Sequence, residues 1–171
     1  RYEFTLFEAG CTDEIFVNVE DVRLELEADL FFCWEDNEVN LNDYVNRNPG
    51  DGILSGPGVM ENNDEFYFNP IRSGPGRHPL VLEALNCTDT LWIEVEGDAD
   101  IPDYQFCERS DALILQADPP GGLWSGPGIL DENSGLFDPQ SLGVGTFEIF
   151  YTSPSGCLTT DTIEVFLFTE V

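Results

Sequence analysis

Lysine is absent from the 171 residues, and only one histidine and one methionine are present. The 6 cationic residues are all arginines and face 34 acidic residues, so the formal net charge is −28 at pH 7. Binding to nucleic acids or to anionic membrane surfaces requires clustered cations, so neither is expected as a partner. Nucleophilic catalysis lacks an activating base apart from His78, for which we expect a structural or solvent-exposed role. We therefore expect no enzyme activity and no catalytic residue.

Long apolar runs are also absent. No run approaches the roughly 20 residues of a membrane-spanning helix, so membrane insertion is not expected. No signal peptide is recognisable, so an exported protein would have its signal elsewhere or would have lost it. What the sequence does contain is 42% hydrophobic and 12% aromatic residues, which are enough for a packed core.

The sequence contains an internal repeat. Ser55-Gly56-Pro57-Gly58 recurs about 70 residues later as Ser125-Gly126-Pro127-Gly128, and Phe68-Asn69-Pro70 recurs as Phe137-Asp138-Pro139. The first residues match the second half of a repeat, because Gly10-Cys11-Thr12-Asp13 parallels Asn86-Cys87-Thr88-Asp89. The predicted organisation is the C-terminal half of one repeat over residues 1–21, followed by whole repeats over 22–97 and 98–171.

Alternating apolar residues predict strands within each repeat. Leu91, Ile93 and Val95 alternate with more polar neighbours, and Phe147, Ile149 and Tyr151 form a similar run. Short runs of this kind, separated by Gly, Pro, Asn and Asp clusters, indicate an all-β fold of tandem Ig-like antiparallel β-sandwich repeats. Trp124, which corresponds to Leu54 in the other repeat, resembles the core tryptophan of immunoglobulin strand C, and we interpret both residues as plain core packing.

Five cysteines are present. Each whole repeat has one before its first core strand and one in its last hairpin, which predicts one disulfide per repeat, Cys33–Cys87 and Cys107–Cys157. Such bonds persist in oxidising compartments, so an extracellular, cell-surface location is expected. Free thiols and metal ligands are the alternative, but no cysteine lies close in sequence to another or to the histidine, which does not favour zinc.

Cys11 is a last-hairpin cysteine. In this predicted pairing Cys33 and Cys107 are already matched, so no cysteine of the chain remains as its partner. We expect its partner upstream of Arg1, which makes the chain a segment of a longer tandem array. Polymerisation by strand exchange is the alternative interpretation.

The last repeat resembles a known family. Gly121-Gly122-Leu123-Trp124 leads into the Ser-Gly-Pro-Gly turn, and Gly135-Leu136-Phe137-Asp138-Pro139 and Gly156-Cys157 follow. This sequence is similar to a repeat of giant Bacteroidota cell-surface adhesins, including gliding-motility adhesins of the SprB type that leave by type IX secretion. The middle repeat departs from the pattern, with Leu54 in place of tryptophan. The resemblance implies surface display, a stalk or adhesive role and no catalysis in the repeat.

The repeat junctions and some loops are rich in carboxylates. Hard cations such as Ca²⁺ require several oxygen ligands at once, so calcium at the junctions is one hypothesis, and otherwise no cofactor is expected. The alternative is a solvated acidic surface that keeps a long fibre soluble. The junction candidates are Glu20, Asp21, Asp98, Asp100 and Asp103.

The family context also suggests O-glycans, which Bacteroidota exporters attach at Asp-Ser/Thr followed by an apolar residue. Asp89-Thr90-Leu91 and Asp161-Thr162-Ile163 fit this pattern, and strand parity places Thr90 and Thr162 on the face opposite the core.

Taken together, the sequence predicts a segment of a long exported stalk or adhesive filament whose partners are neighbouring repeats. Trp92 has outward parity and could stack on a sugar or cover an inter-domain contact. A carbohydrate- or protein-binding adhesin module, with a surface polysaccharide or protein as ligand, is therefore an alternative. A third interpretation is an accessory domain of a secreted enzyme.

Overall fold

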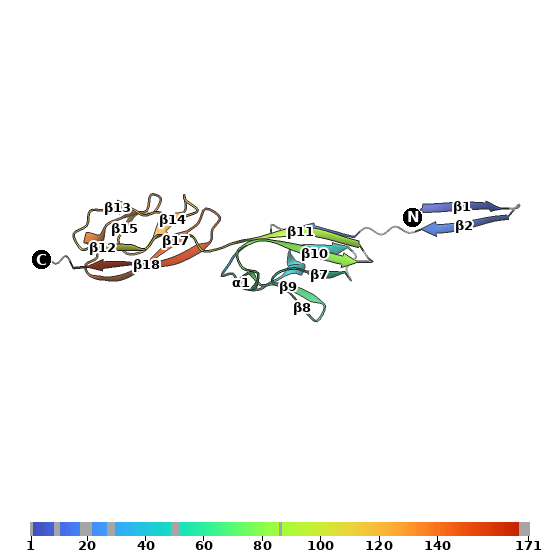
Figure 1. Ribbon diagram of the computed structural model, residues 1–171, viewed down its shortest axis with the longest axis horizontal. Helices are drawn as coiled ribbons and strands as arrows, with labels where there is room; N and C mark the ends of the chain where they lie inside the picture. The colour runs from blue at the N-terminus through green and yellow to red at the C-terminus, as the bar shows by residue number, and fades with distance from the viewer. Residues whose placement is uncertain are drawn as a thin grey trace. The chain divides into compact units, whose positions relative to one another are not determined.

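A computed structural model describes residues 2–8, 11–17, 22–26, 30–48, 52–85 and 87–167. Strands dominate the described part, with one short helix and two 3-10 turns, so the all-β prediction is confirmed (Figure 1). No helix in the described ranges is long and apolar enough to cross a membrane.

The N-terminal strands form a hairpin. β1 (Tyr2–Glu8) pairs antiparallel with β2 (Cys11–Val17), so that Tyr2 lies opposite Val17 and Glu8 lies opposite Cys11. This is the pairing expected of the last two strands of a sandwich. The side chains of the hairpin lie outside the described part of the structure.

The described strands of the middle repeat form three sheets. Their strand orders are β4-β11-β10-β7, β5-β9-β8 and β3-β6. The turn η1 (Leu41–Asp43) precedes β6, and the short helix α1 (Pro70–Ser73) precedes β10. The strands are β3 (Arg23–Leu26), β4 (Phe31–Cys33), β5 (Val39–Asn40), β6 (Val45–Asn48), β7 (Ile53–Ser55), β8 (Val59–Asn62), β9 (Glu65–Phe68), β10 (Gly76–Ala84) and β11 (Cys87–Glu96).

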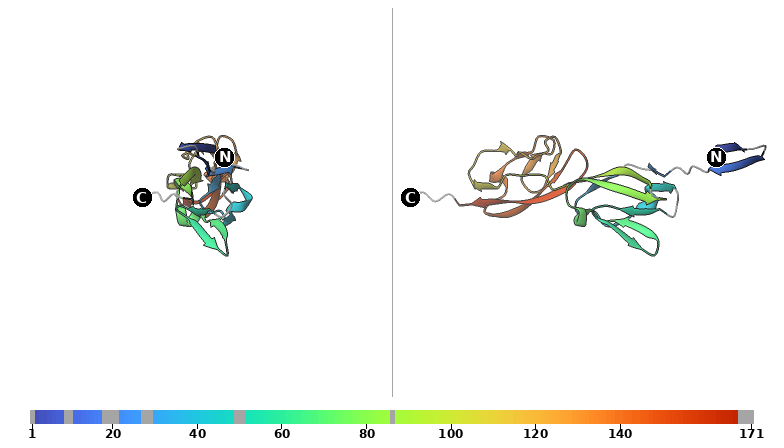
Figure 2. Two further views of the ribbon diagram at one scale, coloured as in Figure 1. Left: turned by 90° about the vertical axis from the view of Figure 1, so that its right-hand side faces the viewer. Right: turned by 45° about the vertical axis from the view of Figure 1, so that its right-hand side comes forward.

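The described strands of the last repeat form two sheets, in the orders β12-β18-β17-β14 and β13-β16-β15. The long β17–β18 hairpin, orange to red in Figure 2, belongs to the first sheet. The turn η2 (Pro139–Ser141) precedes β17. The strands are β12 (Tyr104–Cys107), β13 (Leu113–Ile114), β14 (Leu123–Ser125), β15 (Ile129–Asp131), β16 (Leu136–Phe137), β17 (Gly145–Thr152) and β18 (Leu158–Phe166).

The strand order of the last repeat is that of an Ig-like sandwich. In Ig domains the second, fourth and fifth strands share one sheet, and the third, sixth and seventh share the other. Here β13, β15 and β16 form one sheet, and β14, β17 and β18 lie together in the other. The first strand differs from the constant-type Ig arrangement, because β12 pairs with β18 and does so in parallel. The described strands of the middle repeat give the matching orders β5-β9-β8 and β4-β11-β10-β7.

Trp124 lies in the core, as predicted, with 4% of its surface exposed. It is paired with Tyr151 across β14 and β17, and the ring centroids are 4.8 Å apart. In the middle repeat Leu54 takes the same place opposite Leu82, and both are buried. Side chains of different size therefore fill the same buried position in the two repeats, and both serve core packing.

Two recurring motifs contact each other in both repeats. The Asn69 N–H donates to the Gly58 carbonyl at 2.9 Å, and the Asp138 N–H donates to the Gly128 carbonyl at 2.9 Å. Both glycines have positive φ, and a Cβ on Gly128 would lie 2.6 Å from the Phe137 ring. The Ser-Gly-Pro-Gly turn and the Phe-Asn/Asp-Pro segment therefore recur together because each supports the other.

The chain divides into two compact units with an unexpected boundary. Unit 1 comprises residues 1–31, 37–73 and 77–94, and unit 2 comprises 32–36, 74–76 and 95–171. Two short segments of the middle repeat, 32–36 and 74–76, thus belong to unit 2. The predicted repeat boundaries are statements about sequence and stay predictions.

Candidate functional site

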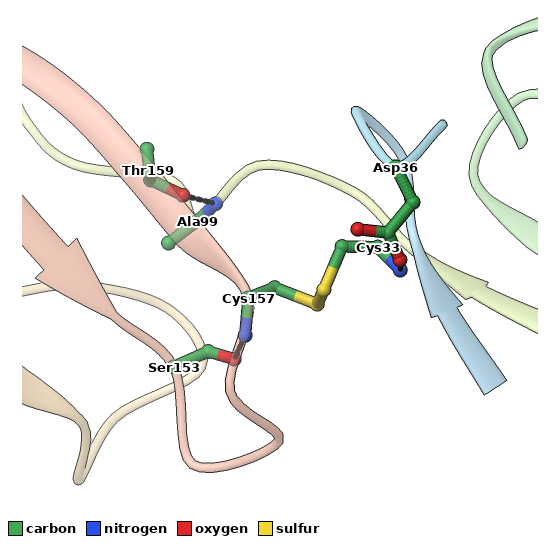
Figure 3. The surroundings of a disulfide bond; sticks show 6 residues. All are labelled: Cys33, Asp36, Ala99, Ser153, Cys157 and Thr159. Atoms are coloured by element: carbon green, nitrogen blue, oxygen red, sulfur yellow. Dashed lines mark hydrogen bonds between the residues drawn. A yellow bond between two sulfur atoms is a disulfide. The ribbon is translucent and has the colours of Figure 1, made fainter.

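A disulfide within unit 2 joins Cys33 to Cys157 (Figure 3). Cys33 ends β4 and Cys157 directly precedes β18, and the two Cα atoms are 5.4 Å apart although 124 residues separate them in sequence. In a chain-entropy treatment, closing a loop of this length stabilises the folded state by about 5 kcal/mol. We call this bond the clasp.

A tight turn holds the Cys33 side of the clasp. The Asp36 carboxylate accepts from the Cys33 N–H at 2.7 Å, and the Asp36 N–H donates to the Cys33 carbonyl at 3.0 Å. The next residue, Trp34, donates its N–H to the Glu96 carbonyl at 2.8 Å. Cys33 is thereby fixed beside the C-terminal end of β11.

The hairpin between β17 and β18 holds the Cys157 side. The Ser153 N–H donates to the Cys157 carbonyl at 2.8 Å, and the Ser153 hydroxyl accepts from the Cys157 N–H at 3.2 Å. Next to this hairpin, the Thr159 hydroxyl accepts from the Ala99 N–H at 2.8 Å, a buried hydrogen bond drawn in Figure 3. Cys157 itself is 4% exposed.

The predicted pairs Cys33–Cys87 and Cys107–Cys157 are wrong, and strand register gives the reason. Cys107 lies opposite Phe166 at the C-terminal end of β18, whereas Cys157 precedes the other end of that strand. At about 3.3 Å per residue, the two ends are about 30 Å apart. Disulfides require Cα atoms within about 7 Å.

The same distance separates Cys33 from Cys87. The Trp34 contact places Cys33 beside Glu96 at the end of β11, and Cys87 begins β11. In the structure Cys87 is an exposed thiol and Cys107 a half-buried one. The side chain of Cys11 lies outside the described part, so its predicted upstream partner stays a prediction.

The junction carboxylates that the structure describes do not gather into a metal-binding group. Glu20 and Asp21 lie outside the described residues, and the described ranges contain no group of three His, Cys, Asp or Glu side chains that could hold a metal ion. The backbone of Asp100 instead bridges to Asp118 through two hydrogen bonds of 2.9 Å. Asp98 and Asp103 accordingly belong to no such group within the described ranges, and calcium binding at the junctions stays a prediction.

In an acidic loop of the last repeat, an aspartate carboxylate is hydrogen-bonded to the loop's own backbone. The Asp131 carboxylate accepts from the Asn133 N–H at 2.9 Å. This hydrogen bond, followed by one from the Ser134 side chain, lowers the pKa of Asp131 below its ordinary value. The carboxylate therefore stabilises the chain reversal after β15.

Thr90 and Thr162 are both exposed, on the outward face that strand parity predicts. In each case the preceding aspartate accepts from the threonine N–H, at 2.8 Å for Thr90 and 2.7 Å for Thr162. The side chains are thus accessible, and their glycosylation stays a prediction.

Trp92 is 49% exposed, which confirms its predicted outward parity. The guanidinium carbon of Arg77 lies 4.4 Å from the centre of the indole ring. A cation stacked on one face of the ring fixes its orientation and leaves an aromatic surface on unit 1. His78, next to this arginine, is half-buried on β10.

No protein-family model and no curated protein match the chain. Solved structures that are similar to it include extracellular domains 3–5 of Drosophila OTK, at 9% identity over 95% of this chain and 68% of that chain, with a TM-score of 0.35. Insect hemolin matches at 11% identity over 98% of this chain, with a TM-score of 0.36. The N-terminal four Ig domains of Dscam1 isoform 9.44 match at 9% identity over 94%, with a TM-score of 0.33.

This chain spans 56% of the hemolin chain and 52% of the Dscam1 chain. TM-scores at this level carry no argument about function. The strand order and register therefore carry the Ig-like assignment.

Proposed function

We propose that this chain is a force-bearing segment of a long exported surface protein, a stalk or adhesive filament built of Ig-like repeats. Three features support the proposal: the recurring sandwich, a disulfide that requires an oxidising compartment, and the resemblance to giant Bacteroidota adhesins of the type IX secretion route. The proposed location is the cell surface, and the proposed partners are neighbouring repeats. No catalytic role and no cofactor are part of the proposal.

The clasp is the observation that carries this role. A stalk is pulled along its chain, and a covalent bond between Cys33 and Cys157 bypasses the residues between them. Those residues can lose their sandwich contacts but cannot extend. At about 3.4 Å per extended residue, the bond withholds about 420 Å of length.

The surface composition fits the same role. The net charge of −28 repels neighbouring filaments and keeps an extended protein soluble. Among the described residues, Arg23 and Glu25 form an ion pair at 2.9 Å in which both side chains are about half exposed. Exposed pairs of this kind contribute little to stability, so sandwich packing and the disulfide provide the mechanical strength.

Single-molecule stretching of the 171-residue chain from its two ends tests the proposal. A variant with Cys11, Cys87 and Cys107 replaced by serine retains only the clasp. We expect its fully stretched length to increase by about 420 Å on reduction. Adding Cys33→Ser and Cys157→Ser should give the longer length with or without reductant. Equal lengths before and after reduction of the clasp-only variant would contradict a force-bearing bond.

The exposed indole of Trp92 supports a second candidate function, binding of a surface polysaccharide or protein. Aromatic rings stack on sugar rings and also anchor protein interfaces, and Arg77 already orients this one. A glycan array tests the candidate with Trp92→Ala and with Leu158→Ala, which also removes an exposed apolar side chain. Binding that is lost only in Trp92→Ala supports it, and no binding by the unmodified chain counts against it.

A further inference from the structure

We infer that the Cys107 thiol forms a second clasp, a disulfide with the last-hairpin cysteine of another repeat of this type. In a second copy of this chain that cysteine is Cys87. The inference deepens the proposed stalk role and rests on it only in its mechanical consequence. The docking site itself is argued from the internal equivalence of the two repeats.

Cys107 cannot pair within its own repeat. Its register opposite Phe166 places it about 30 Å from the β17–β18 hairpin, as the rise per residue requires. That hairpin's cysteine is in any case bonded to Cys33. A partner for Cys107 must therefore come from another repeat.

Cys107 has the same local geometry as the bonded Cys33. The Ser110 hydroxyl accepts from the Cys107 N–H at 3.1 Å, as Asp36 does for Cys33, and the Ser110 N–H donates to the Cys107 carbonyl at 2.9 Å. The following N–H, of Glu108, donates to the Phe166 carbonyl at 3.0 Å, as Trp34 does to Glu96. The turn that presents a bonded cysteine at one position thus presents a free thiol at the other.

The surface around Cys107 corresponds by the repeat to a surface of the middle repeat that groups with the last repeat in unit 2. Segments 32–36 and 74–76 of the middle repeat belong to unit 2, the unit that contains the last repeat, and Cys33 in the first of them is bonded to Cys157 of the last repeat. By the repeat, these segments correspond to 106–110 and 143–145. Segments 106–110 and 143–145 lie close together in the sheet, because Val165 of β18 is paired with Phe106 on one side and with Gly145 on the other.

This corresponding surface carries exposed apolar side chains. Val144 is 54%, Phe166 is 40% and Leu167 is 59% exposed. On the proposed partner, Cys87 begins β11 as Cys157 precedes β18, and its thiol is exposed beside Ile53 and Leu85, which are 58% and 61% exposed. A surface hollow of about 450 Å³ is lined by these three residues together with Glu83, Ala84 and Thr88. Docking would cover apolar surface on both partners.

Bond formation needs an oxidant, and a small-molecule disulfide such as oxidised glutathione supplies it. The Cys107 thiolate attacks one glutathione sulfur and displaces one reduced glutathione. The Cys87 thiolate then attacks the Cys107 sulfur of the mixed disulfide and displaces the second. Two protein thiols lose two protons and two electrons, and the two glutathione molecules leave as thiols.

The consequence is a series of overlapping clasps. The bond from Cys33 to Cys157 spans both Cys87 and Cys107, so a further bond from either cysteine would overlap it. No repeat in such a series could extend by itself under load.

The experiment uses the full chain with Cys11→Ser throughout, in a glutathione redox buffer at about 1 mM protein, which matches the effective concentration of a short tether. Non-reducing electrophoresis separates the products. Cys107→Ser alone and Cys87→Ser alone should stay monomeric, whereas their mixture should form a dimer that does not grow. The chain with both thiols should form a ladder. Dimers in either single variant, or a mixture that stays monomeric, would overturn the inference.

A second pair of variants tests the docking surface. Val144→Asp places a carboxylate on it, and Leu130→Asp places one on the equally exposed β15. We expect dimer formation in the mixed reaction to slow about tenfold with Val144→Asp, because the carboxylate would lose hydration on docking, and to be unchanged with Leu130→Asp. Equal rates would overturn the docking surface. These experiments measure connectivity and the stretching experiment measures length, so failure of the inference is distinguishable from failure of the proposed function.

Discussion

The rings of Trp124 and Tyr151 lie 4.8 Å apart in the core of the last repeat, and the tyrosine hydroxyl reaches beyond that core. It accepts from the Gly122 N–H at 2.8 Å and donates to the Pro119 carbonyl. The contact is tight, because a Cβ on Gly122 would lie 2.6 Å from the Tyr151 ring. One side chain therefore packs the sandwich and fixes the loop that leads into β14.

Tyr151→Phe should lower the free energy of unfolding by about 1–3 kcal/mol, because the buried Gly122 donor and the Pro119 acceptor both lose their partner. Tyr104→Phe is the matched control, since its hydroxyl accepts from the more exposed Gln116 N–H at 2.8 Å. Urea denaturation measures both variants. Equal losses would contradict a special role for the Tyr151 hydroxyl.

Gly128→Ala and Gly143→Ala separate backbone strain from steric conflict. The two residues have φ values of +80° and +82°, so alanine is strained at both. A Cβ meets the Phe137 ring at 2.6 Å only at Gly128, and nothing lies within 4 Å of it at Gly143. We expect a loss of about 1 kcal/mol for Gly143→Ala and at least about twice that for Gly128→Ala. Thermal or chemical denaturation that gives the same loss for both would be inconsistent with the turn contact.

Added salt should raise the melting temperature. With 34 acidic and 6 basic residues, repulsion destabilises the folded state more than exposed ion pairs stabilise it. Raising NaCl from about 0.02 M to about 0.5 M shortens the screening length from roughly 20 Å to below 5 Å. Differential scanning calorimetry should show a rise, and a fall would contradict net repulsion. CaCl₂ at matched ionic strength should add nothing, and a further rise would revive the calcium hypothesis.

Asp131→Asn should destabilise the chain more at neutral pH than in acid. The folded-state pKa of Asp131 is lowered, chiefly by the Asn133 N–H, so its stabilising effect is present above the unfolded-state pKa. That effect is lost as the pH falls through the folded-state pKa. The difference in melting temperature between Asp131→Asn and the unmodified chain should therefore shrink in strong acid. A pH-independent difference would rule out the carboxylate as its cause.

The strands and the core were predictable from sequence because both depend on local alternation. Ile93 and Val95 are buried while Trp92 and Glu94 are exposed, as a period of two requires. The correspondence of Trp124 with Leu54 also held, because the repeat aligned two strands that occupy the same place in two sandwiches.

The disulfide was not predictable from the repeat alone. Four cysteines allow three sets of pairs, and symmetry of the repeats favoured pairing within each one. The parallel pairing of β12 with β18 places Cys107 beside Phe166, far from Cys157, and nothing in the local sequence signals that pairing. Calcium at the junctions stays a prediction for a related reason, because closeness in sequence between Asp98 and Asp103 does not by itself place their oxygens around one point.

The clasp can be tested most directly by peptide mapping of the oxidised chain without reduction. Trypsin cuts only at arginine here, since lysine is absent, and it separates Cys33 in peptide 24–47 from Cys157 in peptide 110–171. Cys87 and Cys107 share peptide 78–109. The account predicts one linked species that joins 24–47 to 110–171. A link from 78–109 to either of these peptides in the monomer would contradict it.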